Sequence, residues 1–372
     1  MNIRATVATS MPPFRAEHIG SLLRPAELMA QRARFARGEI DQAAMTAAED
    51  SAIRDAIRLQ EQLGFKFVTD GEFRRRSYHT FFYRQLGEIG IDTVGDATEA
   101  GRGSQPVAMI GSRVRWTHPI NAADVAFLKA NSDRVPKITI PGPCALHFRG
   151  GDAAVTAVAY KDVDQFWSDT IEAFTKELRA LADAGCHYVQ IDETAFAKFG
   201  DPDVQASLSA RGDDWSALID KYIDVTNKIL RAAPAELRIG MHLCRGNRAG
   251  RWHAEGSYEE VADRLFNALE IPFYFLEYDT PRAGNFTPLR FVPQHKSVIL
   301  GLVSSKTPVL EDKAPLRQRL DDATKFVSLD RLAISPQCGF ASVDTGNPVS
   351  LEAEKRKLEL VCEIARDIWG ET

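Results

Sequence analysis

Short apolar segments that alternate with helical stretches constrain the fold of this chain more than any other feature. These segments are typical of parallel strands that are buried on both faces. Eight strands, most of them separated by a helix, predict an α/β fold of the (β/α)₈ TIM-barrel type, with a doubly wound open sheet as the alternative. The predicted strands comprise residues 14–21, 65–69, 137–143, 187–191, 239–243, 273–276, 297–303 and 332–334.

Residues from about 77 to 135 interrupt the alternation. Glycines and polar residues are mixed there with β-type pieces at residues 107–110 and 113–116. We therefore predict an inserted hairpin and small helix after the second strand, rather than a separate domain. Residues 1–13 are expected to form a flexible N-terminal arm, and residues 14–372 a single catalytic barrel.

Composition narrows the functional class. The hydrophobic content of 44%, the charged content of 26% and the net charge of −5 are ordinary for a globular protein, and they provide no basic surface for nucleic acid or an anionic membrane. No apolar run approaches the length of a membrane span. Five scattered cysteines show no disulfide framework and favour a reducing compartment. We expect a cytoplasmic enzyme.

Polar residues follow most of the predicted strands. In a barrel, the carboxyl ends of the strands converge on the face that carries the active site, so these side chains are expected to share one site. The residues are Ser21, Asp70, Glu72, Asp192, Glu193, His242, Cys244, Glu277, Asp279, Lys306 and Cys338.

A zinc site is the most specific chemistry within this set. His242 and Cys244 are two residues apart on a strand, so their side chains point to the same face. With Cys338 they form a nitrogen and two-sulfur group that suits Zn²⁺, and Glu277 is the candidate fourth ligand. The alternative is that these residues are ordinary buried cysteines and a hydrogen-bonded core histidine. Widely spaced ligands favour a catalytic over a structural site.

Thiolate-coordinated zinc favours chemistry on a thiol substrate, because the metal lowers the pKa of an added thiol. Hydrolysis by zinc-bound water is the less favoured alternative. The carboxylates of Glu72, Asp192 and Glu193 are candidates for binding an amine on that substrate. Alternatively, they form ordinary ion pairs with nearby arginines, namely Arg74, Arg75 or Arg245.

Six motifs give the chain a family resemblance. In order they are residues 18–21 (HIGS), 70–72 (DGE), 190–193 (QIDE), 242–244 (HLC), 276–277 (LE) and 335–339 (SPQCG). From about Phe14 to Trp369, the chain resembles the catalytic barrel of cobalamin-independent methionine synthase, and in particular the short, single-barrel members of that superfamily.

The resemblance implies a TIM-type barrel with Zn²⁺ held by His242, Cys244, Glu277 and Cys338. It also implies that Ile19, Ser21, Glu72 and Asp192 bind the amino-acid end of homocysteine. The implied reaction transfers a methyl group from a methylated folate of the 5-methyltetrahydrofolate type, or from another methyl donor, to the thiol of homocysteine, giving methionine. A homo-oligomer, or a partner protein that delivers the methyl group, stays open.

The sequence departs from the family pattern in the part of the site that would bind the methyl donor. The family has a tryptophan that stacks on the pterin after the third strand, where this chain has residues 142–148, and His147 or Phe148 is the candidate replacement. Lys306 stands where the family has a catalytic histidine. Lys306 and Glu193 are therefore the candidate catalytic residues. The additional N-terminal barrel of the full-length enzymes lies outside the resemblance.

Two other functions are consistent with the sequence. The first is a zinc-dependent transferase that adds a thiol such as coenzyme M to an epoxide, in which Lys306 would protonate the alkoxide or bind the sulfonate. Glu72 and Asp192 argue against it, because they suit an ammonium better than a sulfonate. The second is a non-catalytic zinc-binding barrel, which predicts a closed four-ligand site.

Overall fold

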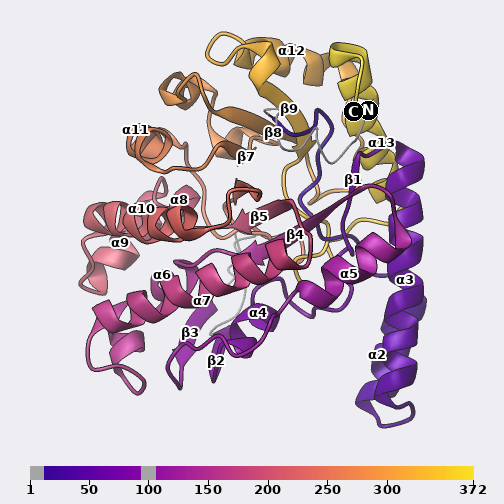
Figure 1. Ribbon diagram of the computed structural model, residues 1–372. Helices are drawn as coiled ribbons and strands as arrows, with labels where there is room; N and C mark the ends of the chain where they lie inside the picture. The colour runs from indigo at the N-terminus through magenta and orange to yellow at the C-terminus, as the bar shows by residue number, and fades with distance from the viewer. Residues whose placement is uncertain (1–11, 94–105) are drawn as a thin grey trace.

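A curled sheet of seven parallel strands forms the centre of the computed structural model, which describes residues 12–93 and 106–372 (Figure 1). The strand residues are almost all buried, as parallel strands covered on both faces should be. In pairing order the strands are β1 (Phe67–Val68), β4 (Val135–Pro141), β5 (Tyr188–Asp192), β6 (Arg238–Leu243), β7 (Phe273–Glu277), β8 (Ser297–Val303) and β9 (Leu332–Pro336).

Helices cover the outside of this sheet, in the alternating order that the sequence predicts (Figure 1). Asp41, Asp162, Asp214 and Ser350 cap four of the helix N-termini through their side-chain oxygens. The helices are α2 (Ala26–Ala36), α3 (Gln42–Leu63), α5 (Ala122–Asn131), α6 (Ala145–Thr156), α7 (Val163–Asp183), α8 (Ala195–Lys198), α9 (Pro202–Ala210), α10 (Trp215–Ala232), α11 (Glu259–Ala268), α12 (Lys313–Ala323) and α13 (Leu351–Trp369), with short 3₁₀ turns η1 (Pro281–Ala283), η2 (Thr287–Phe291) and η3 (Leu329–Arg331).

The eighth barrel position is occupied by residues 14–21, which we call the seam segment. Ala16 forms a parallel bridge with Ile334 of β9, so the segment joins the far edge of the sheet. The predicted strand is reduced to this single bridge, because the carbonyls that follow it accept hydrogen bonds from side chains instead. The donors are Lys137 to His18, Gln190 to Ile19 and Thr69 to Gly20.

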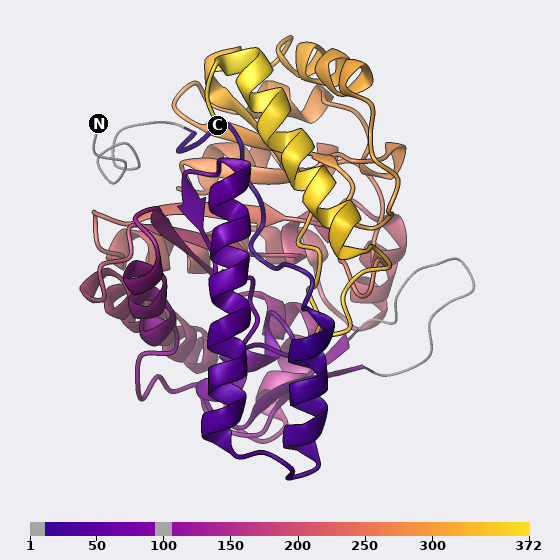
Figure 2. The same ribbon diagram turned by 90° about the vertical axis from the view of Figure 1, so that its right-hand side faces the viewer.

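The outer helices reinforce the closure of the barrel. Helices α3 and α13 lie side by side on the same flank of the molecule (Figure 2). Near their ends, the hydroxyl of Thr372 donates to the carbonyl of Gly64 at 2.7 Å. The N-terminal and C-terminal parts of the chain are thus joined in the outer helical layer as well as in the barrel.

The predicted insertion between the second and third strands contains the expected hairpin. Strands β2 (Ile89–Thr93) and β3 (Pro106–Ile110) pair antiparallel, next to the short helix α4 (Thr80–Gln85). The β-type piece predicted at residues 113–116 is not a strand, because the amide of Val114 donates to the hydroxyl of Tyr160 and Arg113 pairs with Asp169. Of the expected N-terminal arm, only Pro12 and Pro13 fall within the described residues, and both are buried.

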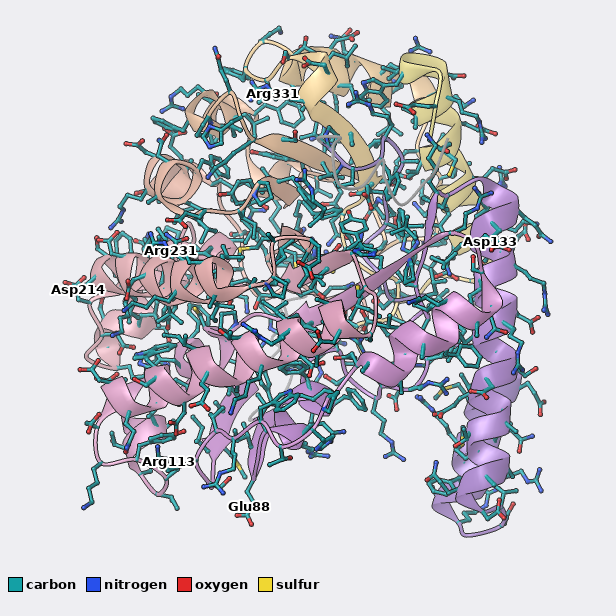
Figure 3. The ribbon with its side chains drawn as sticks, in the orientation of Figure 1. Glu88, Arg113, Asp133, Asp214, Arg231 and Arg331 are labelled. Atoms are coloured by element: carbon teal, nitrogen blue, oxygen red, sulfur yellow. The ribbon has the colours of Figure 1, made fainter. Side chains whose placement is uncertain are left out.

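Charged side chains of both signs are distributed over the surface (Figure 3). Arg231, for example, pairs with Glu270, and Arg113 pairs with Asp169. Within the described ranges, no helix combines the length and apolar character that crossing a bilayer requires.

One ion pair lies inside the barrel, next to the seam segment. The ammonium of Lys137 on β4 lies 3.0 Å from a carboxylate oxygen of Glu17, and neither side chain is exposed to solvent. The hydroxyl of Tyr188 donates to the second oxygen of Glu17 at 2.6 Å. Burial lowers the pKa of Lys137 and raises that of Glu17, whereas their mutual attraction acts in the opposite direction. Each charge therefore depends on the other.

We predict that Lys137→Met lowers the free energy of unfolding by about 3–5 kcal/mol, because it leaves a buried carboxylate without its counter-charge. The double variant E17Q/K137M should recover much of this loss, since neither charge remains. Denaturant unfolding followed by circular dichroism measures both, with the exposed Lys228→Met as control. A midpoint for K137M equal to that of the wild type would show that the pair does not stabilise the barrel.

Candidate metal centre and active site

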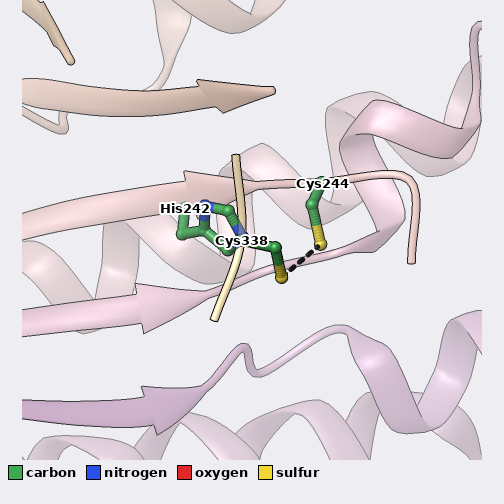
Figure 4. Close-up of side chains that lie close together, drawn as sticks. All are labelled: His242, Cys244 and Cys338. Atoms are coloured by element: carbon green, nitrogen blue, oxygen red, sulfur yellow. Dashed lines mark hydrogen bonds between the residues drawn. The ribbon is translucent and has the colours of Figure 1, made fainter. Parts of the chain in front are cut away.

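His242, Cys244 and Cys338 come together at the carboxyl end of the barrel strands (Figure 4). His242 lies on β6 and Cys244 just after it, as the strand alternation predicts, while Cys338 follows β9. Their donor atoms all lie within 4.8 Å of one another, and the two sulfurs are 3.9 Å apart. All three side chains are buried. We call these residues the donor group.

The donor group fits a zinc ion. Both ring nitrogens of His242 are buried without a hydrogen-bond partner, which is unusual for a polar side chain and leaves a lone pair for a metal. Two thiolates on a tetrahedral zinc, each about 2.3 Å from the metal, are about 3.8 Å apart, close to the sulfur separation here. One imidazole and two thiolates are also the donor chemistry that zinc prefers.

The thiol of Cys338 donates a hydrogen bond to the sulfur of Cys244. The hydrogen bond from Cys338 lowers the pKa of Cys244 far below its ordinary value, and the same contact raises the pKa of Cys338. Burial lowers the pKa of His242, but the adjacent Cys244 outweighs it and the net change is upward. Such a group releases protons when it binds a divalent cation, so its metal affinity increases with pH.

Glu277 lies next to the donor group but is held by cations. It ends β7, and the pairing of Leu243 with Leu276 places Glu277 beside Cys244. Its carboxylate accepts from the amide of Arg245 at 2.6 Å and from Arg282. Burial raises its pKa, but the charges of Lys306, Arg245 and Arg282 outweigh burial and lower that pKa to about 2. Its role as a fourth ligand stays a prediction.

The donor group opens into a cavity of about 210 Å³. The four residues predicted to bind the amino-acid end of a substrate line the same cavity, namely Ile19, Ser21, Glu72 and Asp192. Six of the eleven polar residues that follow the predicted strands therefore line one cavity, namely Ser21, Glu72, Asp192, His242, Cys244 and Cys338. A ligand in this cavity contacts both the donor group and two carboxylates.

Glu72 and Asp192 are held by neighbouring polar groups. The hydroxyl of Thr139 donates to one oxygen of Glu72 at 2.8 Å, and the other oxygen is buried without a partner. Gln190 donates to Asp192 at 2.6 Å. Burial raises the pKa of Asp192 to about 7, with a further contribution from the charge of Glu72. A cation placed between the two carboxylates would offset both the burial of the Asp192 charge and its repulsion by Glu72.

The suggested ion pairing with arginines is present only in part. Arg75 lies 3.7 Å from Glu72, in a buried contact. Arg74 instead pairs with Asp50 and Asp124, away from the cavity.

The chain matches the family model for the catalytic domain of cobalamin-independent synthase over residues 14–352. The chain belongs to this family. The match spans the seam segment, the carboxylates and the whole donor group. The predicted superfamily and the TIM-barrel-like fold are confirmed.

Relatives of this synthase-family chain differ in how closely they resemble it. The uncharacterized protein YxjG of Bacillus subtilis (strain 168) is 38% identical over 368 residues, which are 96% of this chain and 95% of that protein. A crystal structure of a candidate vitamin-B12 independent methionine synthase from Listeria monocytogenes is 31% identical, with a TM-score of 0.74, and covers 96% of this chain and 98% of its own. The 5-methyltetrahydropteroyltriglutamate–homocysteine methyltransferase of Thermosynechococcus vestitus is 23% identical over 90% of this chain and 41% of its own length.

Besides Glu277, three predicted site residues of this synthase-family chain do not line the cavity. Glu193 accepts from the backbone amides of Cys144 and Ala195, each at 3.0 Å, and thereby fixes the turn after β4. His147 is buried, its ring nitrogens bond Tyr222 and Asp152 at 2.8 and 2.7 Å, and its ring lies against that of Trp167, so it presents no free face to a pterin. Both side chains are thus occupied by structural contacts.

Lys306 is the third of these residues. Its ammonium lies 3.6 Å from a carboxylate oxygen of Glu277 and is buried without a hydrogen bond. It therefore contacts Glu277 and lies away from the cavity wall, and its catalytic role stays a prediction.

Several cavity residues were missed from the sequence. They are carried by the insertion and by the segments that follow the strands, where no motif marks them: Tyr78, His79, Arg149, Lys198, Asn247 and Arg248. Only the orientation of these segments in the fold reveals that they face the donor group.

We predict that the purified chain binds one Zn²⁺ and that Cys244→Ala and Cys338→Ala each abolish this binding. Each change removes one of the two thiolates, which supply most of the negative charge of the group. Metal analysis after dialysis against a weak chelator measures the zinc content. Cys362→Ala, a buried cysteine in α13, should leave it unchanged. Full zinc retention in both donor-group variants would contradict the site.

Proposed function

We propose that this chain is a zinc-dependent thiol methyltransferase that makes methionine from homocysteine, with a methylated folate or another methyl donor. The observation that carries the proposal is the shared cavity, in which the donor group lies together with Glu72 and Asp192. Family membership supports a methyl transfer. The proposal assigns the thiol of the substrate to the donor group and its ammonium to the carboxylates.

The carboxylates and the seam segment would select the amino-acid end. Glu72 has a buried oxygen without a hydrogen bond, and Asp192, at the end of β5, lines the same cavity close enough for the charge of Glu72 to raise its pKa. An ammonium provides three N–H donors for these oxygens and cancels their mutual repulsion. The hydroxyl of Ser21 and the side chain of Ile19 complete this part of the wall.

A zinc ion in the donor group would supply Lewis acidity that keeps a thiol ionised at neutral pH. The surrounding residues would hold the donor group in place. Arg245, Arg282 and Lys306 keep Glu277 ionised beside Cys244, and Asn247 donates to the carbonyl of Gly339 at 2.8 Å, next to Cys338. In this proposal Lys306 and Glu193 are positioning residues.

The two alternative functions fit the site less well. A coenzyme M type thiol has no ammonium, so it would leave the buried carboxylates of Glu72 and Asp192 without a cationic partner. A purely structural zinc site requires no adjoining cavity and is normally closed. The geometry therefore favours an amino-acid thiol and a catalytic role.

We predict that zinc-loaded protein converts homocysteine to methionine with at least one donor in a screen of methyl-folates, methylcobalamin and methylated sulfonium compounds. Mass spectrometry of the product, with labelled methyl groups, detects the reaction. The absence of methionine with every donor would overturn the proposed function.

Substitution of the carboxylates tests the assignment of the ammonium. Glu72→Gln and Asp192→Asn should each raise the KM for homocysteine about tenfold or more, since a charged hydrogen bond contributes about 1.5–3 kcal/mol. Lys228→Gln, on the exposed face of α10, is the matched control. A KM equal to that of the wild type in both variants would place the ammonium elsewhere.

A further inference from the structure

Three cationic side chains line one part of the cavity. Arg149 lies in α6, Lys198 ends α8 and Arg248 follows β6, and together we call them the basic wall. Among the residues that the structure describes, none of the three forms an ion pair with a carboxylate. Glu72 and Asp192 in the same cavity belong to the strand ends, so the cavity is lined by groups of both signs.

Arg149 has more donors than partners. Its Nη2 donates to the hydroxyl of Tyr78 at 3.2 Å, whereas its Nε and Nη1 are buried without a hydrogen bond. A guanidinium has five N–H donors, and buried donors are rarely left unsatisfied in native proteins. The unused donors belong to a side chain on the cavity wall, so a ligand in the cavity is the available acceptor.

Lys198 is held in a similarly unusual state. The residue is 1% exposed, and its ammonium lies 5.5 Å from the ring centroid of Phe148. Burial and the charge of Arg149 lower its pKa to about 7. The charges of Cys244 and Glu193 act against this shift of the pKa, and the carboxylate of Glu193 already accepts two backbone amides.

The surrounding side chains do not neutralise the basic wall. His79 and His253 also line the cavity, and burial together with the charges of Arg149, Lys198 and Arg248 lowers the pKa of both imidazoles. These histidines are therefore neutral near pH 7 and add no repulsion. A cavity with low-dielectric walls concentrates the field of fixed charges, and this part of it attracts anions.

We propose that the basic wall is a binding site for an oxyanion, such as a carboxylate, sulfonate or phosphate group, carried by the second substrate. Assignment to the second substrate rests on the proposed function, because there the first substrate places its ammonium on Glu72 and Asp192. The anion site itself does not depend on methyl transfer. In this arrangement the donor group lies in one cavity with a site for each substrate.

The reactivity of Lys198 provides a test that requires no enzymatic turnover. Zinc-loaded protein is labelled at pH 7 with trace acetic anhydride, and the acetylation of Lys198 relative to the exposed Lys228 is measured by peptide mass spectrometry. The probes are inorganic phosphate and methanesulfonate. A bound anion that raises the pKa of Lys198 by one unit lowers its free-amine fraction, and so its labelling, about fivefold.

We expect both anions to protect Lys198, with homocysteine present as well as absent. Protection should be lost in Arg149→Gln, and it should persist in Arg264→Gln, an exposed arginine of α11. Failure of both anions to protect Lys198 would overturn the site. Retention of protection in Arg149→Gln would exclude Arg149 from it, and if that variant does not fold, the wild-type measurements decide.

A further arm separates the two sources of the anion. If homocysteine alone protects Lys198 and abolishes the effect of phosphate, the basic wall binds the carboxylate of the thiol substrate, and assignment to the second substrate is wrong. The anion measurements without homocysteine remain valid even when no methionine is formed. Failure of the proposed function and failure of the anion site are therefore distinguishable.

Discussion

The buried ion pair between Glu17 and Lys137 stabilises the barrel where the seam segment meets the neighbouring strands. The seam segment makes only one strand-type bridge, so the backbone ladder that stabilises the other junctions is missing there. Side chains from the neighbouring strands replace it, and the ammonium of Lys137 contributes to both the carboxylate of Glu17 and the carbonyl of His18. A charge that is fully buried and doubly bonded fixes the segment more precisely than an apolar contact would.

Closure of the barrel also determines the geometry of the site. Ser21 ends the seam segment, and Cys338 follows β9, the strand that the segment bridges. The two meet at Gly339, where an added Cβ would lie 1.9 Å from the hydroxyl oxygen of Ser21. Any larger residue at this position would displace the hydroxyl of Ser21. The wall that would receive an amino acid and the turn that carries a metal ligand are therefore parts of one rigid junction.

The sequence is sufficient to predict the features that depend on strand periodicity. Alternation places His242 and Cys244 on one face, and the barrel brings Cys338 to them. Residues fixed by contacts from distant segments were beyond its reach. His147 is held by Tyr222 of α10, and Glu193 by the turn after β4. For Glu193, however, strand alternation was a usable signal. Adjacent strand residues point to opposite sides, so Asp192 and Glu193 were not expected to enter the same cavity.

The charges in the cavity are arranged for a ligand rather than for the stability of the empty fold. The carboxylate of Glu277 already has the positive charges of Lys306, Arg245 and Arg282 close to it. Glu72, Asp192, Arg149 and Lys198 instead keep unused hydrogen-bonding capacity or pKa values shifted by burial, which costs folding free energy. Groups of opposite sign in one small cavity would neutralise each other if they met. The two carboxylates and the two cations form no ion pairs with each other across the cavity, so each set stays available to a substrate group of opposite charge.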